Sequence, residues 1–398
     1  MTVPRVLFGV DRVVQDPALL APASRVGLVT NEAARLARDV MRPGRVALLE
    51  AGVPLVRLFS PEHGLGATGE DGAPMRDGVD AATGCPIVSL YGDRFAPPEE
   101  SLADLDLVLF DVPDVGARFY TYAWTLSHVM EACARTGTPL AVLDRPNPLG
   151  GLLDDAEGPL LDESQCASFI GRWSIPVRHS LTLGELARHW AATRVRQAQL
   201  SVVTCEGWRR TMLWPALGLP WVPTSPAIRA FASSLVHPGT CLFEGTNLSV
   251  GRRTDASFQG VGAPWLDPAR VIAAAALPFA WGVQLADDDF TPELGPYAGE
   301  RCRAVRLVVP DPARVRPVAV GLALLAAVIR AHPRDFDWAP YRTAANPGGG
   351  DHFARLVGVR HIAPRLLERE SPVTPALVRE WTSAAAWTPA VRPALLYD

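Results

Sequence analysis

The sequence predicts an α/β protein in which a parallel sheet covered by helices is followed by a smaller mixed α+β domain. Two observations support this prediction. Short apolar runs alternate with longer amphipathic runs up to about residue 223, whereas turn-rich segments dominate beyond it. The length of 398 residues accommodates two domains, and a composition of 48% hydrophobic and 20% charged residues is ordinary for a globular enzyme with a sizeable core.

Five short apolar runs in the first half are predicted to be strands. They are rich in β-branched residues and apolar on both faces, as expected for buried strands of a parallel sheet. They cover residues 25–30, 54–60, 86–91, 107–112 and 140–144.

Two helical patterns in the first half have recognisable ends. After Thr121, apolar residues recur at the spacing of one helix face as far as Cys133, and Gly137 is placed to end that helix. Thr182 and Glu185 have the spacing of a capping box, which predicts the start of a second helix.

The second half of the chain predicts a different mixture of elements, from which we expect one domain over residues 1–223 and an auxiliary domain over residues 224–398. Pro- and Gly-broken loops separate its apolar segments. The predicted elements are a helix near 269–276, strands at 279–285 and 303–309, an apolar helix at 318–331 and a last helix at about 375–386.

The charged residues exclude several classes of enzyme. All 38 basic residues are arginines, so a Schiff-base lysine and a P-loop lysine are both absent, and with them the ordinary pyridoxal phosphate enzymes and Walker NTPases. The net charge of −4 and the pI of about 6.1 disfavour a nucleic-acid-binding surface.

The cysteines and the first residues bear on the compartment. The closest pair of cysteines, Cys133 and Cys166, is 33 residues apart, which disfavours a zinc ribbon or a redox dithiol and predicts buried free thiols in a reducing compartment. The first ten residues show neither the charged region nor the apolar stretch of a signal peptide. The longest apolar run, 318–329, is well short of the ~20 residues that span a bilayer. We therefore expect a cytoplasmic protein.

Polar residues follow four of the five predicted strands. Because the carboxyl ends of parallel strands line the ligand crevice of an open α/β sheet, these residues are expected to converge. They lie in segments 60–64, 91–93, 111–122 and 144–148.

Glu62 is the sharpest candidate for a catalytic acid. A carboxyl group beside an apolar strand end can be partly desolvated, which raises its pKa toward that of a general acid. The neighbouring His63 orients Glu62, binds substrate, or only holds its own loop. Asp111 and Asp114 offer second carboxylates for catalysis.

Further polar residues are candidates for binding a substrate. Arg118 and Arg145 carry planar guanidinium groups suited to a carboxylate, unless each pairs with a local Asp. Tyr120 and Tyr122 offer a stacking surface for a sugar, unless they belong to the core. The remaining candidates are Asn147, His179 and, in a polar loop at the expected domain junction, Glu244, Thr246, Asn247 and Arg252.

Three common motifs do not apply. Residues 64–69 match the pattern GxGxxG, but the Glu-Asp-Gly-Ala-Pro that follows cannot open a helix, so we reject a dinucleotide site. Neither a GxSxG elbow nor an HExxH pair is present. We expect no cofactor and no metal; a metal-dependent hydrolase with ligands among Glu62, His63, Asp111 and His179 is kept as an alternative.

Six short motifs occur in one order along nearly the whole chain. Together they resemble the NamZ-type exo-β-N-acetylmuramidase family, long catalogued as a domain of unknown function. The nine residues 114–122 are the most specific of them, whereas segments 112–116, 179–182, 225–229 and 251–254 depart from the pattern expected for the family. The six motifs are Ser-Pro-Glu-His-Gly (60–64), Leu-Tyr-Gly (90–92), Asp-Val-Gly-Ala-Arg-Phe-Tyr-Thr-Tyr (114–122), Leu-Asp-Arg-Pro-Asn-Pro (143–148), Glu-Gly-Pro (157–159) and Phe-Glu-Gly-Thr-Asn (243–247).

The resemblance implies both a fold and an activity. The fold is an unconventional Rossmann-like parallel-sheet domain with a C-terminal mixed α+β auxiliary domain and an active site in the cleft between them. The activity is release of terminal N-acetylmuramic acid from the non-reducing end of peptidoglycan fragments during cell-wall turnover. The resemblance makes Glu62 the catalytic acid. Because this sugar bears a lactyl carboxylate, Arg118 or Arg145 is expected to bind it.

The second catalytic group and the stereochemistry stay open at this point. Asp114 or Asp111 serves as base or charge stabiliser, and retaining, inverting and substrate-assisted routes are all compatible with the sequence. A non-catalytic muropeptide-binding protein is a second alternative to the glycosidase. The expected partner is a small glycan, with no nucleic acid and no membrane insertion; the sequence says nothing about oligomeric state.

Overall fold

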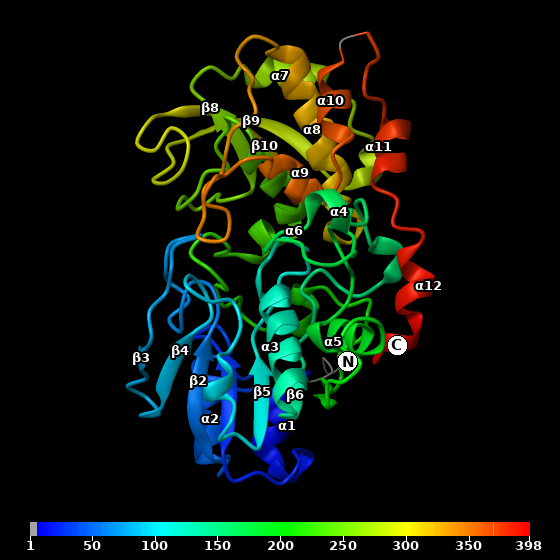
Figure 1. The fold of residues 1–398 in the computed structure, drawn as a ribbon. Helices are drawn as coiled ribbons and strands as arrows, with labels where there is room; N and C mark the ends of the chain where they lie inside the picture. The colour runs from blue at the N-terminus through cyan, green and yellow to red at the C-terminus, as the bar shows by residue number, and fades with distance from the viewer. Residues whose placement is uncertain (1–5, 369) are drawn as a thin grey trace.

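The computed structural model describes residues 6–368 and 370–398, which form two stacked domains (Figure 1). The first domain holds a seven-stranded sheet in the order β3-β4-β2-β1-β5-β6-β7, parallel throughout except for β3. All five predicted strands are present. The strands are β1 (Val26–Thr30), β2 (Leu55–Ser60), β3 (Gly78–Val79), β4 (Pro86–Ser89), β5 (Leu107–Asp111), β6 (Leu140–Leu143) and β7 (Leu200–Val203).

The strand order makes this a Rossmann-like sheet. The chain runs outward from β1 through β2 to β4 and then returns to the other side of β1 with β5, β6 and β7. The reversal lies between β1 and β5, the point at which ligands bind in many open α/β sheets. Asp111, the last residue of β5, and Asn31, which follows β1, lie at this point.

Both faces of the sheet are covered, which explains why its strands are apolar throughout. Alternate residues of β5 belong to two different hydrophobic clusters: Val108 and Phe110 pack with helices α3 and α5, whereas Leu107 and Leu109 pack with α1 and α2. The four helices are α1 (Gly9–Gln15), α2 (Gly44–Glu50), α3 (Tyr122–Thr136) and α5 (Leu183–Thr193); a short α4 (Glu163–Cys166) lies between them in sequence.

The two predicted helix ends are confirmed. Gly137 follows α3 with a left-handed φ of 73°, which glycine adopts without strain. At the start of α5 the Thr182 hydroxyl accepts from the Glu185 amide while the Glu185 carboxylate accepts from the Thr182 amide.

The second domain is a small antiparallel sheet packed with helices, as predicted. Its strands, in the order β8-β10-β9, are β8 (Gly260–Ala263), β9 (Gln284–Phe290) and β10 (Cys302–Val308). The apolar helix α8 packs between α6 and α7. The helices are α6 (Phe231–Thr240), α7 (Pro268–Ala274), α8 (Pro317–Ala331), α9 (His352–Val357), α10 (Ile362–Leu367), α11 (Pro375–Trp381) and α12 (Trp387–Val391).

Two predicted elements of this domain are wrong in their extent. The strand predicted at 279–285 begins only at Gln284, because Phe279–Trp281 form a 3-10 turn that ends at the left-handed Gly282. The helix predicted at 375–386 stops at Trp381. There the Thr382 carbonyl accepts from the amide of Gly158 in the first domain, so the chain leaves the helix before α12 begins.

Buried polar groups join the two domains. The Glu157 carboxylate accepts the backbone amides of Val318 and Ala319 in the first turn of α8, at 3.2 and 2.7 Å. At the other end of the chain, the Tyr397 hydroxyl reaches Asp144 and the Leu396 amide donates to Glu185. The last residues therefore return to the first domain, beside α5 in Figure 1.

The described residues include no helix that is both long and apolar enough to cross a membrane. The six cysteines are all buried free thiols.

Candidate active site

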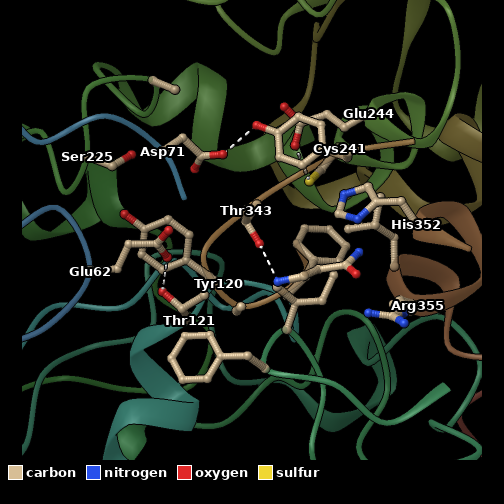
Figure 2. A pocket seen from close by; sticks show the side chains of 18 of the residues that line it. Glu62, Asp71, Tyr120, Thr121, Ser225, Cys241, Glu244, Thr343, His352 and Arg355 are labelled. Carbon is tan, nitrogen blue, oxygen red and sulfur yellow. Dashed lines mark hydrogen bonds between the residues drawn. The ribbon is translucent and has the colours of Figure 1, made fainter. Parts of the chain in front are cut away.

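A cavity of about 80 Å³ lies where loops of the two domains meet. Figure 2 shows acidic, hydroxyl and basic side chains from both domains around it. The first domain contributes the loops after β2 and β4 and the start of α3, and the second contributes α6, the loop near residue 341 and α9. The polar residues that line it are Glu62, His63, Asp71, Tyr91, Tyr120, Thr121, Ser168, Ser225, His237, Cys241, Glu244, Arg252, Tyr341, Thr343, Asn346, His352 and Arg355.

Glu62 lies two residues beyond the end of β2 and is only 5% exposed. Its Oε1 accepts from the Gly72 amide at 2.9 Å, and its Oε2 accepts from the Thr121 hydroxyl at 2.6 Å. Burial raises the pKa of Glu62 above its usual value, against the opposing effects of His63 and of these two hydrogen bonds. The raised pKa favours the protonated form of this side chain.

His63 is held in one orientation beside Glu62. Its backbone has a φ of 67°, a left-handed conformation that is uncommon outside glycine, and its ring Nδ1 hydrogen-bonds the Gly69 carbonyl at 2.8 Å. The loop from residue 64 to 72 therefore folds back over Glu62, and both Gly72 and Gly69 contact the pair.

Asp71 lies on the same loop, but its surroundings lower its pKa, whereas those of Glu62 raise it. Its Oδ2 accepts from the Tyr341 hydroxyl and lies 3.3 Å from an amino nitrogen of Arg252. Burial acts to raise the pKa of Asp71, but Arg252, His63 and the Tyr341 hydroxyl outweigh it and hold the pKa below its usual value. Asp71 is therefore an ionised carboxylate.

Glu62 and Asp71 form a pair of carboxyl groups with different protonation. One carboxylate oxygen each from Glu62 and Asp71 and one ring nitrogen of His63 lie within 4.8 Å of one another. Environments that push the pKa values of two neighbouring carboxyl groups apart are typical of an acid and its charged partner in catalysis. Both groups face the same space in Figure 2.

Arg252 anchors the second domain's side of the cavity. It pairs with Glu244 at 2.6 Å and with Asp71, and its guanidinium lies over the rings of Phe258 and Tyr341. The one positive charge of Arg252 is thus paired with two carboxylates, one from each domain.

Two family models match consecutive parts of the chain. Residues 26–232 match the family model described as "Exo-beta-N-acetylmuramidase NamZ, N-terminal", and residues 235–397 match its C-terminal counterpart. The chain belongs to the NamZ family. It is 36% identical over 335 residues to the "Peptidoglycan beta-N-acetylmuramidase NamZ" of Bacillus subtilis (strain 168), which covers 84% of this chain and 80% of that protein.

Two solved structures share the fold. Both are described as DUF1343 family proteins of Bacteroides fragilis NCTC 9343. The first superposes with a TM-score of 0.86 at 26% identity, covering 99% of this chain and 100% of the other. The second has a TM-score of 0.73 at 24% identity, covers 99% of each chain and supports the fold alone. Membership of the NamZ family, expected from the motifs, is confirmed.

Five of the predicted site residues of this NamZ family member lie together. Glu62, His63, Tyr120, Glu244 and Arg252 all line the cavity. Tyr122 lies directly behind them, fully buried, where its hydroxyl donates to the Thr224 carbonyl at 2.8 Å.

Arg118, predicted to bind a substrate carboxylate, does not line the cavity. It is fully buried and donates to the carbonyls of Pro159, Ile175 and Leu356 at 2.7 to 2.9 Å. A Cβ on Gly358 would lie 2.3 Å from its guanidinium, so the second domain closes tightly over it. Arg118 therefore fastens α9 to the first domain and does not reach the cavity.

Arg145 and Asp111 are likewise not brought to the cavity. They form a buried bidentate pair, with the two N–O distances at 2.7 and 3.1 Å, and a third donor of Arg145 reaches the Arg35 carbonyl. The structure therefore contains the local salt bridge between Arg145 and an Asp that the sequence left open as an alternative.

Asp114, His179 and Asn147 hold the neighbouring loops. Asp114 accepts from the Gly116 amide and lies 3.4 Å from His179, and Asn147 donates to the Leu181 carbonyl. Asp114 and Asp111 therefore do not supply the second carboxylate of this cavity, because neither lines it.

Thr246 and Asn247 also have structural partners. The Thr246 hydroxyl donates to the Phe243 carbonyl, and the Asn247 amide group bonds the backbone of Asp335 and Asp337. They fix the loop from which Glu244 points into the cavity.

Sequence reasoning missed Asp71, Thr121, Tyr341 and His352. The signal for Asp71 was present, since it lies in the Glu-Asp-Gly-Ala-Pro segment that directly follows residues 64–69 and was considered only as evidence against a dinucleotide site. Tyr341 precedes the Asn-Pro-Gly-Gly-Gly loop, but nothing in the sequence pairs it with a carboxylate 270 residues away.

The three donors Glu62, His63 and Asp71 are close enough to be considered as metal ligands. Their existing partners fit a cation poorly. Both oxygens of Glu62 already accept from protein donors, and the guanidinium of Arg252 already places a positive charge beside Asp71. The arrangement is better matched to acid catalysis beside an ionised carboxylate.

Proposed function

We propose that the protein releases terminal N-acetylmuramic acid from the non-reducing end of peptidoglycan fragments, with Glu62 as general acid and Asp71 as its ionised partner. The observation that carries the proposal is the pair itself: a carboxyl with a raised pKa within 4.8 Å of one with a lowered pKa, in one cavity. Membership of the NamZ family supports the choice of sugar.

Glu62 is arranged to deliver a proton to the glycosidic oxygen. Because the Gly72 amide occupies Oε1, the proton of the neutral carboxyl belongs on Oε2. The partner of Oε2 is the Thr121 hydroxyl, which can accept a hydrogen bond as well as donate one. It can hold the protonated carboxyl in place until the leaving oxygen takes the proton.

Asp71 is arranged to stabilise the positive charge that develops at the anomeric carbon. One of its carboxylate oxygens lies within 4.8 Å of an oxygen of Glu62, close enough for both groups to act on one glycosidic bond. We propose that Asp71 either attacks the anomeric carbon or orients the 2-acetamido group for attack, and both routes retain the configuration. NMR of the first product distinguishes retention from inversion.

Membership of the NamZ family supports exo action, because both matching family models are described as exo-β-N-acetylmuramidase. The six buried free thiols support a reducing compartment, so cytoplasmic action on imported or internal fragments stays our prediction.

The test uses two substrates that differ in leaving group. Para-nitrophenyl N-acetyl-β-muramide has a good leaving group, whereas the disaccharide of N-acetylmuramic acid linked to N-acetylglucosamine has a poor one. Glu62→Gln is expected to lower kcat on the disaccharide by roughly 10³-fold and to lower it less on the aryl glycoside.

Two results would reject the proposal. Wild-type kcat of Glu62→Gln on the disaccharide would remove Glu62 as the acid. Binding of the disaccharide by the folded wild-type protein without turnover would favour a non-catalytic muropeptide-binding protein.

A further inference from the structure

Two arginines line the described part of the cavity, and only one of them is neutralised. Arg252 pairs with Glu244 and Asp71, as described above. Arg355 stands on α9 and is partly exposed. Among residues 6–368 and 370–398, no carboxylate oxygen is paired with its guanidinium and no hydrogen bond of that group is made.

Two histidines of the cavity lining, His352 and His237, do not supply a competing positive charge. Burial lowers the pKa of His352 to about 4 and that of His237 to about 3, so both rings are neutral near pH 7. His352 in addition stacks on the Tyr341 ring at 4.7 Å. Arg355 is therefore the permanent positive charge on this side of the cavity.

Arg355 lies away from the catalytic pair. In Figure 2 it occupies the opposite side of the cavity from Glu62, next to His352. A ligand held at its anomeric end by Glu62 and Asp71 would thus present its other substituents toward Arg355. An uncompensated guanidinium in a partly buried wall is a strong site for a planar anion such as a carboxylate.

We propose that Arg355 binds the lactyl carboxylate of the substrate and so determines that the enzyme takes N-acetylmuramic acid in preference to N-acetylglucosamine. This inference rests on the proposed function. It assigns to Arg355 the role for which Arg118 and Arg145 were expected but from which their buried partners exclude them.

Apolar side chains of the cavity suit the rest of the lactyl group. Phe169, Ile170 and Leu356 line the cavity together with Arg355, and Leu356 is the neighbour of Arg355 in the chain. A lactyl ether carries one methyl group and one carboxylate on a single carbon, so it requires an apolar contact and a cation. The cavity lining includes both.

The test compares three para-nitrophenyl β-glycosides. The first is the N-acetylmuramide, the second is its lactyl methylamide, in which a neutral amide replaces the carboxylate, and the third is the N-acetylglucosaminide, which lacks the lactyl group. Each is assayed with the wild-type protein, Arg355→Met, Arg355→Lys and the control Arg360→Met. Arg360 lies just beyond α9, pairs with Asp351 at 2.8 Å and does not line the cavity.

For the wild-type protein we expect kcat/KM on the muramide to exceed that on the methylamide by roughly 10- to 100-fold, the value of a charge-assisted hydrogen bond. Arg355→Met is expected to remove this difference by raising KM on the muramide, with little change on the two uncharged substrates. Arg355→Lys is expected to recover part of the preference, because it keeps the charge and loses the planar fork. Arg360→Met should behave like the wild-type protein.

The outcomes separate the two proposals. A wild-type preference for the muramide that survives in Arg355→Met would overturn the assignment of Arg355 while leaving the proposed function intact. An equal fall on all three substrates would also overturn it, since it would show a structural role. A wild-type protein that hydrolyses none of the three would instead reject the proposed function.

Discussion

Two regions of this protein bury several charges each, and they differ in how those charges are balanced. At the crevice where the sheet reverses, Asp111 has its own arginine, Arg145, and the space left is only about 30 Å³. In the cavity between the domains, Asp71 and Glu244 share the guanidinium of Arg252, whereas Glu62 is paired with no arginine among the described residues.

The comparison explains why the usual ligand crevice of a Rossmann-like sheet is not the candidate site here. A buried charge with a complete set of partners holds loops in place and has no capacity left for a ligand. Burial raises the pKa of Asp111 as well as that of Glu62. Asp111 is fixed by Arg145, whereas Glu62 has only the Gly72 amide and the Thr121 hydroxyl as partners and lines the cavity. The partners of the carboxyl group, and not its pKa alone, distinguish the structural region from the candidate site.

The largest expected effect is on activity, and it concerns Glu62 in the cavity between the domains. Glu62→Gln should lower kcat on the disaccharide by roughly 10³-fold while leaving the free energy of unfolding at neutral pH unchanged or slightly higher. The native state keeps a proton on Glu62 at a pH where the unfolded state has lost it, so this residue lowers stability as the pH rises. Urea unfolding at pH 5 and pH 8 checks the stability, and a large loss at both would place Glu62 with the structural residues.

The matched substitution at Asp111, in the crevice where the sheet reverses, should lower stability and leave activity almost unchanged. Asp111→Asn leaves the Arg145 guanidinium buried without its carboxylate, which is expected to cost about 3–5 kcal/mol of unfolding free energy. If the variant folds, its kcat at 20 °C should remain within a few-fold of the wild-type value. A variant of normal stability without activity would move Asp111 into the catalytic machinery.

The pH profile should sharpen the contrast within the cavity. The proposed mechanism needs Asp71 ionised and Glu62 protonated, so kcat/KM should fall as the pH drops through the lowered pKa of Asp71 and fall again as it rises through the raised pKa of Glu62. Tyr341→Phe removes one donor to Asp71 and should move the acidic limb to higher pH. An acidic limb that does not move in this variant would show that Asp71 is not the group observed.

The smallest expected effect concerns the start of α5 in the first domain. The Thr182 hydroxyl accepts from the Glu185 amide and donates to Asp144 at 2.7 Å, so Thr182→Ala should cost about 1–2 kcal/mol. Calorimetry should show a melting temperature a few degrees lower, with kcat unchanged. Thr182→Ser, which keeps the hydroxyl, serves as the control.

The candidate site was only partly predictable from the sequence. Glu62 was found because its position after an apolar strand implies burial, and burial alone raises the pKa of a carboxyl. Arg118 and Arg145 were predicted to meet the substrate because a guanidinium suits a carboxylate wherever it stands. Which carboxylate or carbonyl it meets depends on segments far away in the chain, such as Leu356, which lies 238 residues from Arg118.

The sequence by itself determined the features that depend on neighbours in the chain. The five strands, the glycine that ends α3 and the capping box of α5 all follow from side-chain period and backbone preference within a few residues. Only the tertiary structure decided which charges are neutralised. The Tyr341 hydroxyl that hydrogen-bonds Asp71 is 270 residues away in the chain. Because charged and polar groups interact through space, a local sequence pattern does not show which of them will be in contact.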